Sequence, residues 1–177
     1  MTGVDLSAGF LEEARAAAPE VEWLRVDMRA LPWADRFDAA YCWGNSFAYF
    51  EHAECRRFPE AVARALRRGG CFILDSGAVA ESLLPALQTE RRLQIGDIDF
   101  HSRNVYDAFQ SRMDITYTFA RGSCREINPI HQWVHTAGEI RRMLEEASLE
   151  PLEAWGDLAG SPYAVGSSRL IALARRV

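Results

Sequence analysis

The sequence predicts a layered α/β domain in which strands of a mainly parallel sheet alternate with helices. Short apolar runs of strand length recur, and the run over residues 37–43 is nearly continuous. Such continuity is typical of a strand buried on both faces of a parallel sheet. Stretches with 3.6-residue apolar spacing separate these runs. Up to residue 75 the resulting order is strand, helix, strand, strand, helix, strand.

The chain opens with a strand and a helix. Residues 1–5 read as a short buried strand that ends in Asp5, and Ser7 can cap a helix over residues 8–18. Pro19 ends that helix. We expect one of its faces to pack on a sheet, and the apolar residues of this face are Phe10, Leu11, Ala14 and Ala18.

Three more elements complete the first part of the sheet. Residues 21–26 read as a strand, and residues 53–68 as a helix ended by Gly69-Gly70. Residues 71–75 form the next buried strand. We expect Pro59 in the first turn of the helix, or as its kink.

The pattern changes between residues 90 and 133. Extended runs over 97–106, 113–120 and 124–133 predict antiparallel hairpins. We interpret residues 90–133 as a β-hairpin lid inserted into a single domain of residues 1–177. A capping box at Thr136 starts the last helix, and two strands close the chain.

Composition limits the partners. The 177 residues carry a formal net charge of −5 and are 49% hydrophobic. No global positive field recruits nucleic acid or a membrane surface, so we expect a small-molecule partner. No apolar leader opens the chain, and the four cysteines form no C-x-x-C pair, so a cytoplasmic protein with reduced thiols is expected.

The first strand differs from the usual opening of a nucleotide-binding domain. In such domains a glycine-rich turn lies one unit before the acidic residue that binds ribose. Asp5 suits that acidic position, yet no G-x-G precedes it. We therefore expect the domain to be incomplete at its N-terminus, lacking one strand and one helix.

Several phrases carry a family resemblance through their order and spacing. They are GVDLSAGFLEEAR at 3–15, VDM at 26–28, FD at 37–38, NSFAYF at 45–50, LRRGG at 66–70 and the helix after Thr136. Together they resemble class I S-adenosylmethionine-dependent methyltransferases of the small-molecule type. The resemblance implies a Rossmann-like, seven-stranded sheet with an antiparallel last strand. The cofactor S-adenosyl-L-methionine would lie over the carboxyl ends of the first strands. The glycine-rich motif has no counterpart here, which leaves open whether this chain alone is active.

The first group of expected cofactor contacts follows the first two strands. Asp5, with Leu6 beside it, is placed to accept hydrogen bonds from ribose hydroxyls. The resemblance implies that Asp27 accepts from the adenine amino group and that Met28 contacts the ring. The alternatives are that Asp5 stabilises a helix start and that Met28 fills the core.

The second group follows the strand at residues 37–43. We expect Trp43, Gly44 and Asn45 at the methionine end of the cofactor, because Gly44 admits close approach and Asn45 both donates and accepts. Tyr49 and Phe50 are candidate walls of the transfer site, with simple core packing as the alternative.

The resemblance implies that the expected lid supplies substrate contacts, and the candidates in it are Tyr106, His131, Trp133 and His101. Which strand face points inward stays open. If the acceptor is a hydroxyl, His131 and His101 are the candidate bases. His131 and His135 lack the further ligands of a metal site, so no metal is expected.

The leading hypothesis is methyl transfer to a small-molecule nitrogen or oxygen acceptor by in-line displacement. One alternative is an NAD-dependent oxidoreductase fragment, because Asp5 also suits that cofactor. Another is a non-catalytic remnant or interaction module. A strand missing between those that end at Asp5 and Trp43 would leave two unpaired edges, open to self-association.

Overall fold

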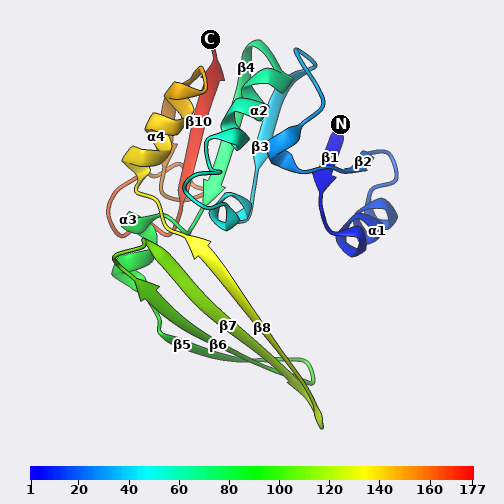
Figure 1. The fold of residues 1–177 in the computed structure, drawn as a ribbon, viewed down its shortest axis with the longest axis vertical. Helices are drawn as coiled ribbons and strands as arrows, with labels where there is room; N and C mark the ends of the chain where they lie inside the picture. Colours follow the sequence, from blue (N-terminus) through cyan, green and yellow to red (C-terminus); the bar gives the residue numbers. More distant parts are fainter.

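The computed structural model describes all residues from 1 to 177 and contains three sheets. Two of them form an N-terminal unit and a central body, and the third projects from the body as a long antiparallel blade (Figure 1). The prediction of a layered α/β domain is confirmed. None of the helices is both long and apolar enough to cross a membrane.

The N-terminal unit consists of β1 (Thr2–Asp5), α1 (Ala8–Ala17) and β2 (Glu22–Arg25), with β1 parallel to β2. Ser7 caps α1, and its hydroxyl oxygen accepts a hydrogen bond from the Phe10 N–H at 3.3 Å. The prediction that Phe10 faces the sheet is wrong, since its side chain is 67% exposed. Two short strands offer α1 only a narrow apolar surface, which Leu11 occupies.

The body is a four-stranded sheet in the order β3-β4-β10-β9. Strands β3 and β4 are parallel, and β10 runs antiparallel to both of its neighbours. Helices α2 and α4 pack against this sheet (Figure 1). The bounds are β3 (Phe37–Cys42), α2 (Arg57–Ala65), β4 (Leu66–Ser76), α4 (Ala137–Glu146), β9 (Leu149–Trp155) and β10 (Leu170–Arg176).

The apolar core lies between α2, α4 and the body sheet. Phe58 and Val62 of α2 and Ile140 of α4 meet Phe72 and Leu74 of β4 in one cluster of buried side chains. Burial of this apolar area is the main stabilising contribution to the body. The body is therefore the rigid support for the loops at the carboxyl ends of its strands.

The predicted helix end at Gly69-Gly70 is wrong. Helix α2 begins at Arg57 and ends at Ala65, and both glycines lie inside β4. There β4 has an irregular register with β3, and a Cβ at Gly70 would lie 2.9 Å from the carbonyl oxygen of Arg67. Glycine is thus required by a close backbone approach within the strand rather than by a helix cap.

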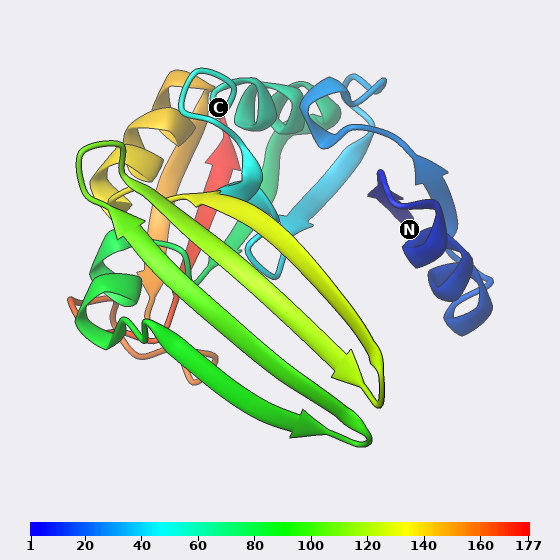
Figure 2. The same cartoon turned by 60° about the horizontal axis from the view of Figure 1, so that its bottom comes forward.

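The prediction that β3 is buried on both faces is also wrong, since Tyr41 is 67% exposed. Strand β3 pairs only with β4, and β1 pairs only with β2. The seven-stranded sheet implied by the resemblance is absent, and sheets of two and four strands take its place. In Figure 2, β1 lies between β2 and β3, with no strand between β1 and β3.

The projecting blade corresponds to the expected lid, and we call it the lid sheet. Its four antiparallel strands are β5 (Glu90–Ile95), β6 (Ile98–Asp107), β7 (Arg112–Arg121) and β8 (Cys124–Trp133). The last three match the predicted extended runs within a few residues, and β5 was not separately predicted. Helix α3 (Ala80–Leu83) and the 3-10 turn η3 (Leu84–Ala86) connect the body to β5.

Candidate functional site

The carboxyl ends of β3 and β4 are held together by two side chains. Asp75, whose side chain is 1% exposed, accepts a hydrogen bond from the Gly44 N–H at 2.9 Å. The side-chain oxygen of Asn45 accepts from the Gly77 N–H at 2.5 Å. Arg169 donates to the other carboxylate oxygen of Asp75 at 3.1 Å. These contacts fix the loop that the sequence predicts at the methionine end of the cofactor.

The backbone of this loop takes an unusual path. Gly44 and Asn45 have φ values of 78° and 69°, both in the left-handed region. Glycine enters this region at no steric cost, and asparagine tolerates it better than most residues. A Cβ at Gly44 would meet no atom within 4 Å, so the space beside it is open.

Aromatic side chains surround the loop with different exposures. Trp43 is 44% exposed and Tyr49 is 50% exposed, so both offer surface to a ligand. Tyr49 ends the 3-10 turn η2 (Ser46–Tyr49). Phe50 instead packs against the main core and lies edge-on to Phe47. Core packing therefore accounts for Phe50, while Tyr49 remains free to form a wall.

Asp5 lies at the carboxyl end of β1 and is exposed. One of its carboxylate oxygens accepts from the Ser7 N–H at 2.7 Å. The other makes no hydrogen bond within the chain, so it stays available to a ligand hydroxyl. Leu6, directly after it, is 54% exposed.

Asp27 follows β2 and caps the 3-10 turn η1 (Met28–Ala30). Its carboxylate receives two donors from the Arg29 guanidinium, the shorter contact being 2.7 Å. The Arg29 hydrogen bonds lower the pKa of Asp27. Arg29 also pairs with Glu54 at 2.8 Å. Met28 is half-buried and packs against the main core, as the alternative interpretation of that residue predicted.

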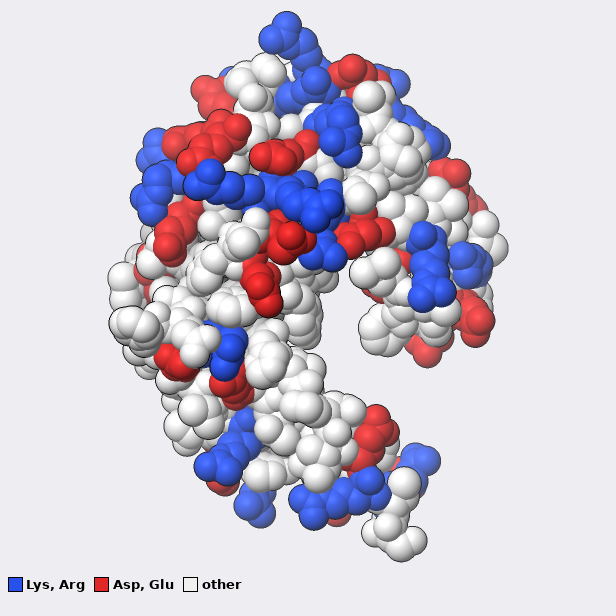
Figure 3. All heavy atoms as spheres, viewed as in Figure 1, with Lys and Arg blue, Asp and Glu red and all other residues white.

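A hollow separates the N-terminal unit from the body and the lid sheet (Figure 3). The carboxyl ends of β1 and β3 belong to the two units on either side of it. Asp5, at the end of β1, and the Gly44-Asn45 loop, after β3, therefore lie on opposite sides of this hollow. Both were expected to contact the cofactor.

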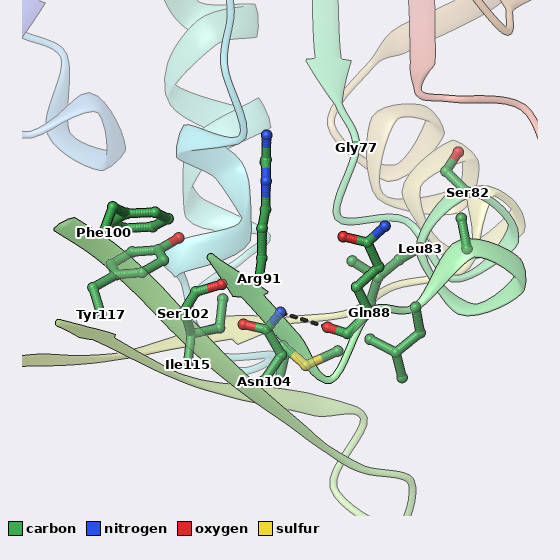
Figure 4. Close-up of a pocket in the computed structure, with 13 residues that line it drawn as sticks. Gly77, Ser82, Leu83, Gln88, Arg91, Phe100, Ser102, Asn104, Ile115 and Tyr117 are labelled. Carbon is green, nitrogen blue, oxygen red and sulfur yellow. Dashed lines mark hydrogen bonds between the residues drawn. The ribbon is translucent and has the colours of Figure 1, made fainter. Parts of the chain in front are cut away.

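A pocket of about 350 Å³ lies where the lid sheet meets α3 and the end of β4 (Figure 4). Its apolar lining comes from both the lid sheet and the α3 segment. Its polar lining includes Ser102, Asn104 and Gln88, and Gly77 contributes backbone. Its volume lies within the range that is usual for ligand pockets.

The strand register of the lid sheet decides which side chains face this pocket. Arg91 pairs with Ser102, and Ser102 with Tyr117, so these three share the face toward the pocket, called the inner face. Tyr106 pairs with pocket-lining Met113 and also lies on the inner face.

Three of the predicted lid residues lie on the opposite face. His101 pairs with Thr118, His131 with Asp114, and Trp133 with Arg112, and none of the predicted three lines the pocket. The His131 Nδ1 atom lies 2.6 Å from an Asp114 oxygen. The Trp133 ring lies 5.3 Å from the His52 ring. The structure thus separates Tyr106 from the other lid candidates.

Tyr117 is a site residue that sequence reasoning missed. It lines the pocket. Burial is the main cause that raises the pKa of its hydroxyl, and the neighbouring Tyr49 is a smaller one. The hydroxyl therefore stays protonated at neutral pH and acts as a hydrogen-bond donor. Period-2 alternation with Met113 and Ile115 was the signal in the sequence that could have identified it.

A buried pair of side chains was also missed. The Cys55 sulfur lies 3.2 Å from Nε2 of His135, and both side chains are fully enclosed. Burial raises the pKa of Cys55 to about 12 and, together with the nearby His52, lowers that of His135 to about 4. Both groups are therefore neutral at pH 7. No cluster of His, Cys, Asp and Glu suited to a metal ion is present.

Comparison with known proteins relates the chain to methyltransferases in sequence. The family described as methyltransferase domain matches residues 1–70. A trans-aconitate 2-methyltransferase from an Azoarcus species is 35% identical over 75 residues, which are 42% of this chain and 28% of that protein. The chain thus corresponds to well under half of that relative.

Solved structures extend the likeness over the whole chain. An S-adenosylmethionine-dependent methyltransferase from Clostridium acetobutylicum superposes with a TM-score of 0.85 at 18% identity, covering 99% of this chain and 74% of that one. An amino pentose methyltransferase from Micromonospora echinaspora, with S-adenosylmethionine bound, superposes with a TM-score of 0.74 at 20% identity, covering 98% and 73%. The first 70 residues are thus similar to the methyltransferase domain family, and the whole chain shares the fold of these solved S-adenosylmethionine-dependent methyltransferases.

Proposed function

We propose that this domain transfers a methyl group from S-adenosylmethionine to a nitrogen or oxygen atom of a small molecule. One observation carries the proposal. Gly77 lines the lid pocket, and its N–H donates to the Asn45 side chain in the expected cofactor loop. The pocket for an acceptor and the loop for the methionine end of the cofactor therefore share a wall.

The residues present fit the cofactor on the ribose and methionine sides. Asp5 offers a free carboxylate oxygen at a strand end, and the open space beside Gly44 admits close approach to the backbone. When bound, the cofactor supplies an electrophilic methyl group. Asp27 would have to exchange a contact with Arg29 to accept from the adenine amino group, because Arg29 donates to both of its carboxylate oxygens.

The pocket lining favours nitrogen over oxygen as the acceptor atom. No histidine or carboxylate lines it, and the Tyr117 hydroxyl is protonated at neutral pH. A hydroxyl acceptor needs a base within reach, whereas an amine needs only its lone pair. The protein then contributes orientation and exclusion of water rather than proton transfer.

The space between strands β1 and β3 is expected to affect how tightly the cofactor binds. Both strands present an unpaired edge to it, and the cofactor residues lie on its two sides. We propose that a strand and a glycine-rich turn seated in this interval complete the cofactor site. This chain alone would then hold the cofactor weakly.

The same edges support a second candidate function, that of a non-catalytic interaction module. Unpaired N–H and C=O groups on parallel-type strands are templates for another strand. Self-association of the chain, measured by sedimentation at increasing concentration, would favour this candidate if S-adenosylhomocysteine binding is absent. A monodisperse monomer would exclude self-association through these edges.

The direct test is ultraviolet cross-linking of S-adenosylmethionine that carries a radioactive methyl group. We expect label in the native chain, competed by S-adenosylhomocysteine, and less label in Asp5→Ala. Asp38→Ala is the matched control, since Asp38 is an exposed acid at the amino end of β3, away from the carboxyl ends of the strands, and is paired with Arg67. Equal labelling of the native chain and Asp5→Ala would remove Asp5 from the cofactor site.

A further inference from the structure

We infer that the lid pocket recognises an acceptor that carries an oxyanion, a carboxylate or a phosphate, held by Arg91. That the bound molecule is the methyl acceptor rests on the proposed function. The oxyanion site itself follows from the geometry of the pocket.

Arg91 is the one charged side chain among the 13 residues that line the pocket. No acidic side chain lines it, and the Arg91 guanidinium forms no ion pair or hydrogen bond within the chain. In Figure 4 its extended side chain stands away from β5, toward the space between Tyr117 and Gln88. A guanidinium left without a partner beside a cavity is suited to two parallel hydrogen bonds with an oxyanion.

The neighbouring arginine shows the contrast. Arg92 points to the other face of the lid sheet, where its guanidinium lies 3.9 Å from Glu90. Acidic residues outnumber basic ones in this chain, 25 to 20, so arginines commonly find carboxylates on the surface. Arg91 differs from Arg92 in that no carboxylate lies beside its guanidinium in the pocket.

The rest of the pocket is suited to a flat or apolar body. The rings of Phe100 and Tyr117 lie 5.5 Å apart on the inner face, beside Ile115. Leu83 and Leu87 line it from the α3 side. Such a lining binds the carbon skeleton of a small molecule, while a few polar groups fix its orientation.

Asn104 supplies an oriented acceptor. Its side-chain N–H donates to the Gln88 carbonyl oxygen at 2.6 Å, shown as the dashed line in Figure 4. This contact fixes the amide, and the side-chain oxygen makes no hydrogen bond within the chain. An N–H or O–H of the bound molecule can donate to that oxygen. The expected ligand therefore combines an oxyanion, an apolar body and a donor group.

The test uses simple probes in calorimetry. Benzoate and phenyl phosphate represent the two sources of an oxyanion, and benzamide is the neutral counterpart of benzoate. We expect one or both anions to bind the native chain more tightly than benzamide does. In Arg91→Gln that preference should fall about tenfold, because a charged hydrogen bond contributes roughly that factor.

Arg92→Gln is the matched control, since it removes the same charge from the other face of the same strand. It should leave the preference for anions unchanged, and Arg91→Lys should restore part of it. Equal binding of benzamide and both anions, or an unchanged preference in Arg91→Gln, would overturn the inference. Circular dichroism of each variant checks that it folds.

Binding of S-adenosylhomocysteine is measured separately on the same proteins. If it binds and the probes show no dependence on Arg91, the inference is wrong and the proposed function stands. If the probes depend on Arg91 and S-adenosylhomocysteine binds neither this chain nor a form with an added strand and glycine-rich turn between β1 and β3, the pocket is an oxyanion site and the proposed function fails.

Discussion

The buried carboxylate of Asp75 accepts a hydrogen bond from the Gly44 N–H across the ends of two parallel strands. Arg169, on the segment before β10, donates to the same carboxylate. One enclosed acid thus connects three segments at the edge of the sheet where the expected cofactor loop begins. Its environment makes this side chain a structural support of the site.

Asp75→Ala should lower the free energy of unfolding by about 1–3 kcal/mol, because it leaves the Gly44 N–H and the half-exposed Arg169 without their acceptor. Urea denaturation measures the change. Asp38→Ala, which breaks the exposed pair with Arg67, should cost less than about 1 kcal/mol. Equal losses in the two variants would contradict the structural role of Asp75.

Gly70→Ala should destabilise the body sheet by about 1–3 kcal/mol, because the new Cβ would lie 2.9 Å from one backbone oxygen and 3.1 Å from another. Gly9→Ala, inside α1, is the matched control. Its Cβ meets only the Ser7 hydroxyl at 3.9 Å, so alanine should stabilise the helix by about 0.5–1 kcal/mol. The two changes should therefore have opposite signs in thermal unfolding.

His135 should make stability depend on pH between about 6.5 and 4. Burial lowers its pKa to about 4 in the folded chain, so the unfolded chain binds the proton first. The stabilisation is complete above pH 6.5 and is lost as the pH falls toward 4, by about 3 kcal/mol in total.

Urea denaturation at pH 7 and pH 4.5 tests this dependence. The difference between the two pH values should shrink in His135→Gln. The substitution His131→Gln, at an exposed histidine, should leave the difference between the two pH values unchanged. A native pH dependence that survives in His135→Gln would show that other groups cause it.

Thiol labelling should distinguish the cysteines. Burial raises the pKa of Cys42 and Cys55 to about 12, so neither forms the reactive thiolate in the folded chain. Cys124 is exposed and should react rapidly with a disulfide reagent. Cys124→Ser should remove the rapid phase, while labelling of Cys42 and Cys55 should await denaturant. Rapid labelling of Cys55 in the folded chain would contradict its enclosure beside His135.

Local patterns were sufficient to predict several elements. The Ser7 cap and the capping box at Thr136 both form as the sequence indicates, because they depend on residues three positions apart. The alternating runs between residues 97 and 133 likewise predicted the last three strands of the lid sheet. The antiparallel strands of this region follow from the local alternation of apolar and polar residues.

Features that depend on distant contacts were not predictable. Gly70 resembles a helix stop locally, yet it lies in a strand because Asp38 and Arg67 approach its backbone. Tyr41 is exposed because β3 is an edge strand that pairs only with β4, which its own apolar run does not reveal.

The candidate site shows the same limit. Strand-end residues such as Asp5 and Asn45 could be named from their positions, but the pocket face of the lid sheet could not. A shift of register by one residue exchanges the two faces, and only the observed pairing separates Tyr117 from His131. The Cys55-His135 pair joins residues 80 positions apart, and no local pattern predicts such a contact.

Calorimetry with S-adenosylhomocysteine tests the central claim most directly. It would compare this chain with a version that carries an added N-terminal strand, glycine-rich turn and helix to fill the interval between β1 and β3. We expect clear binding by the extended form and much weaker binding by this chain. Absence of binding by both would contradict the assignment of a cofactor site at the ends of β1 and β3.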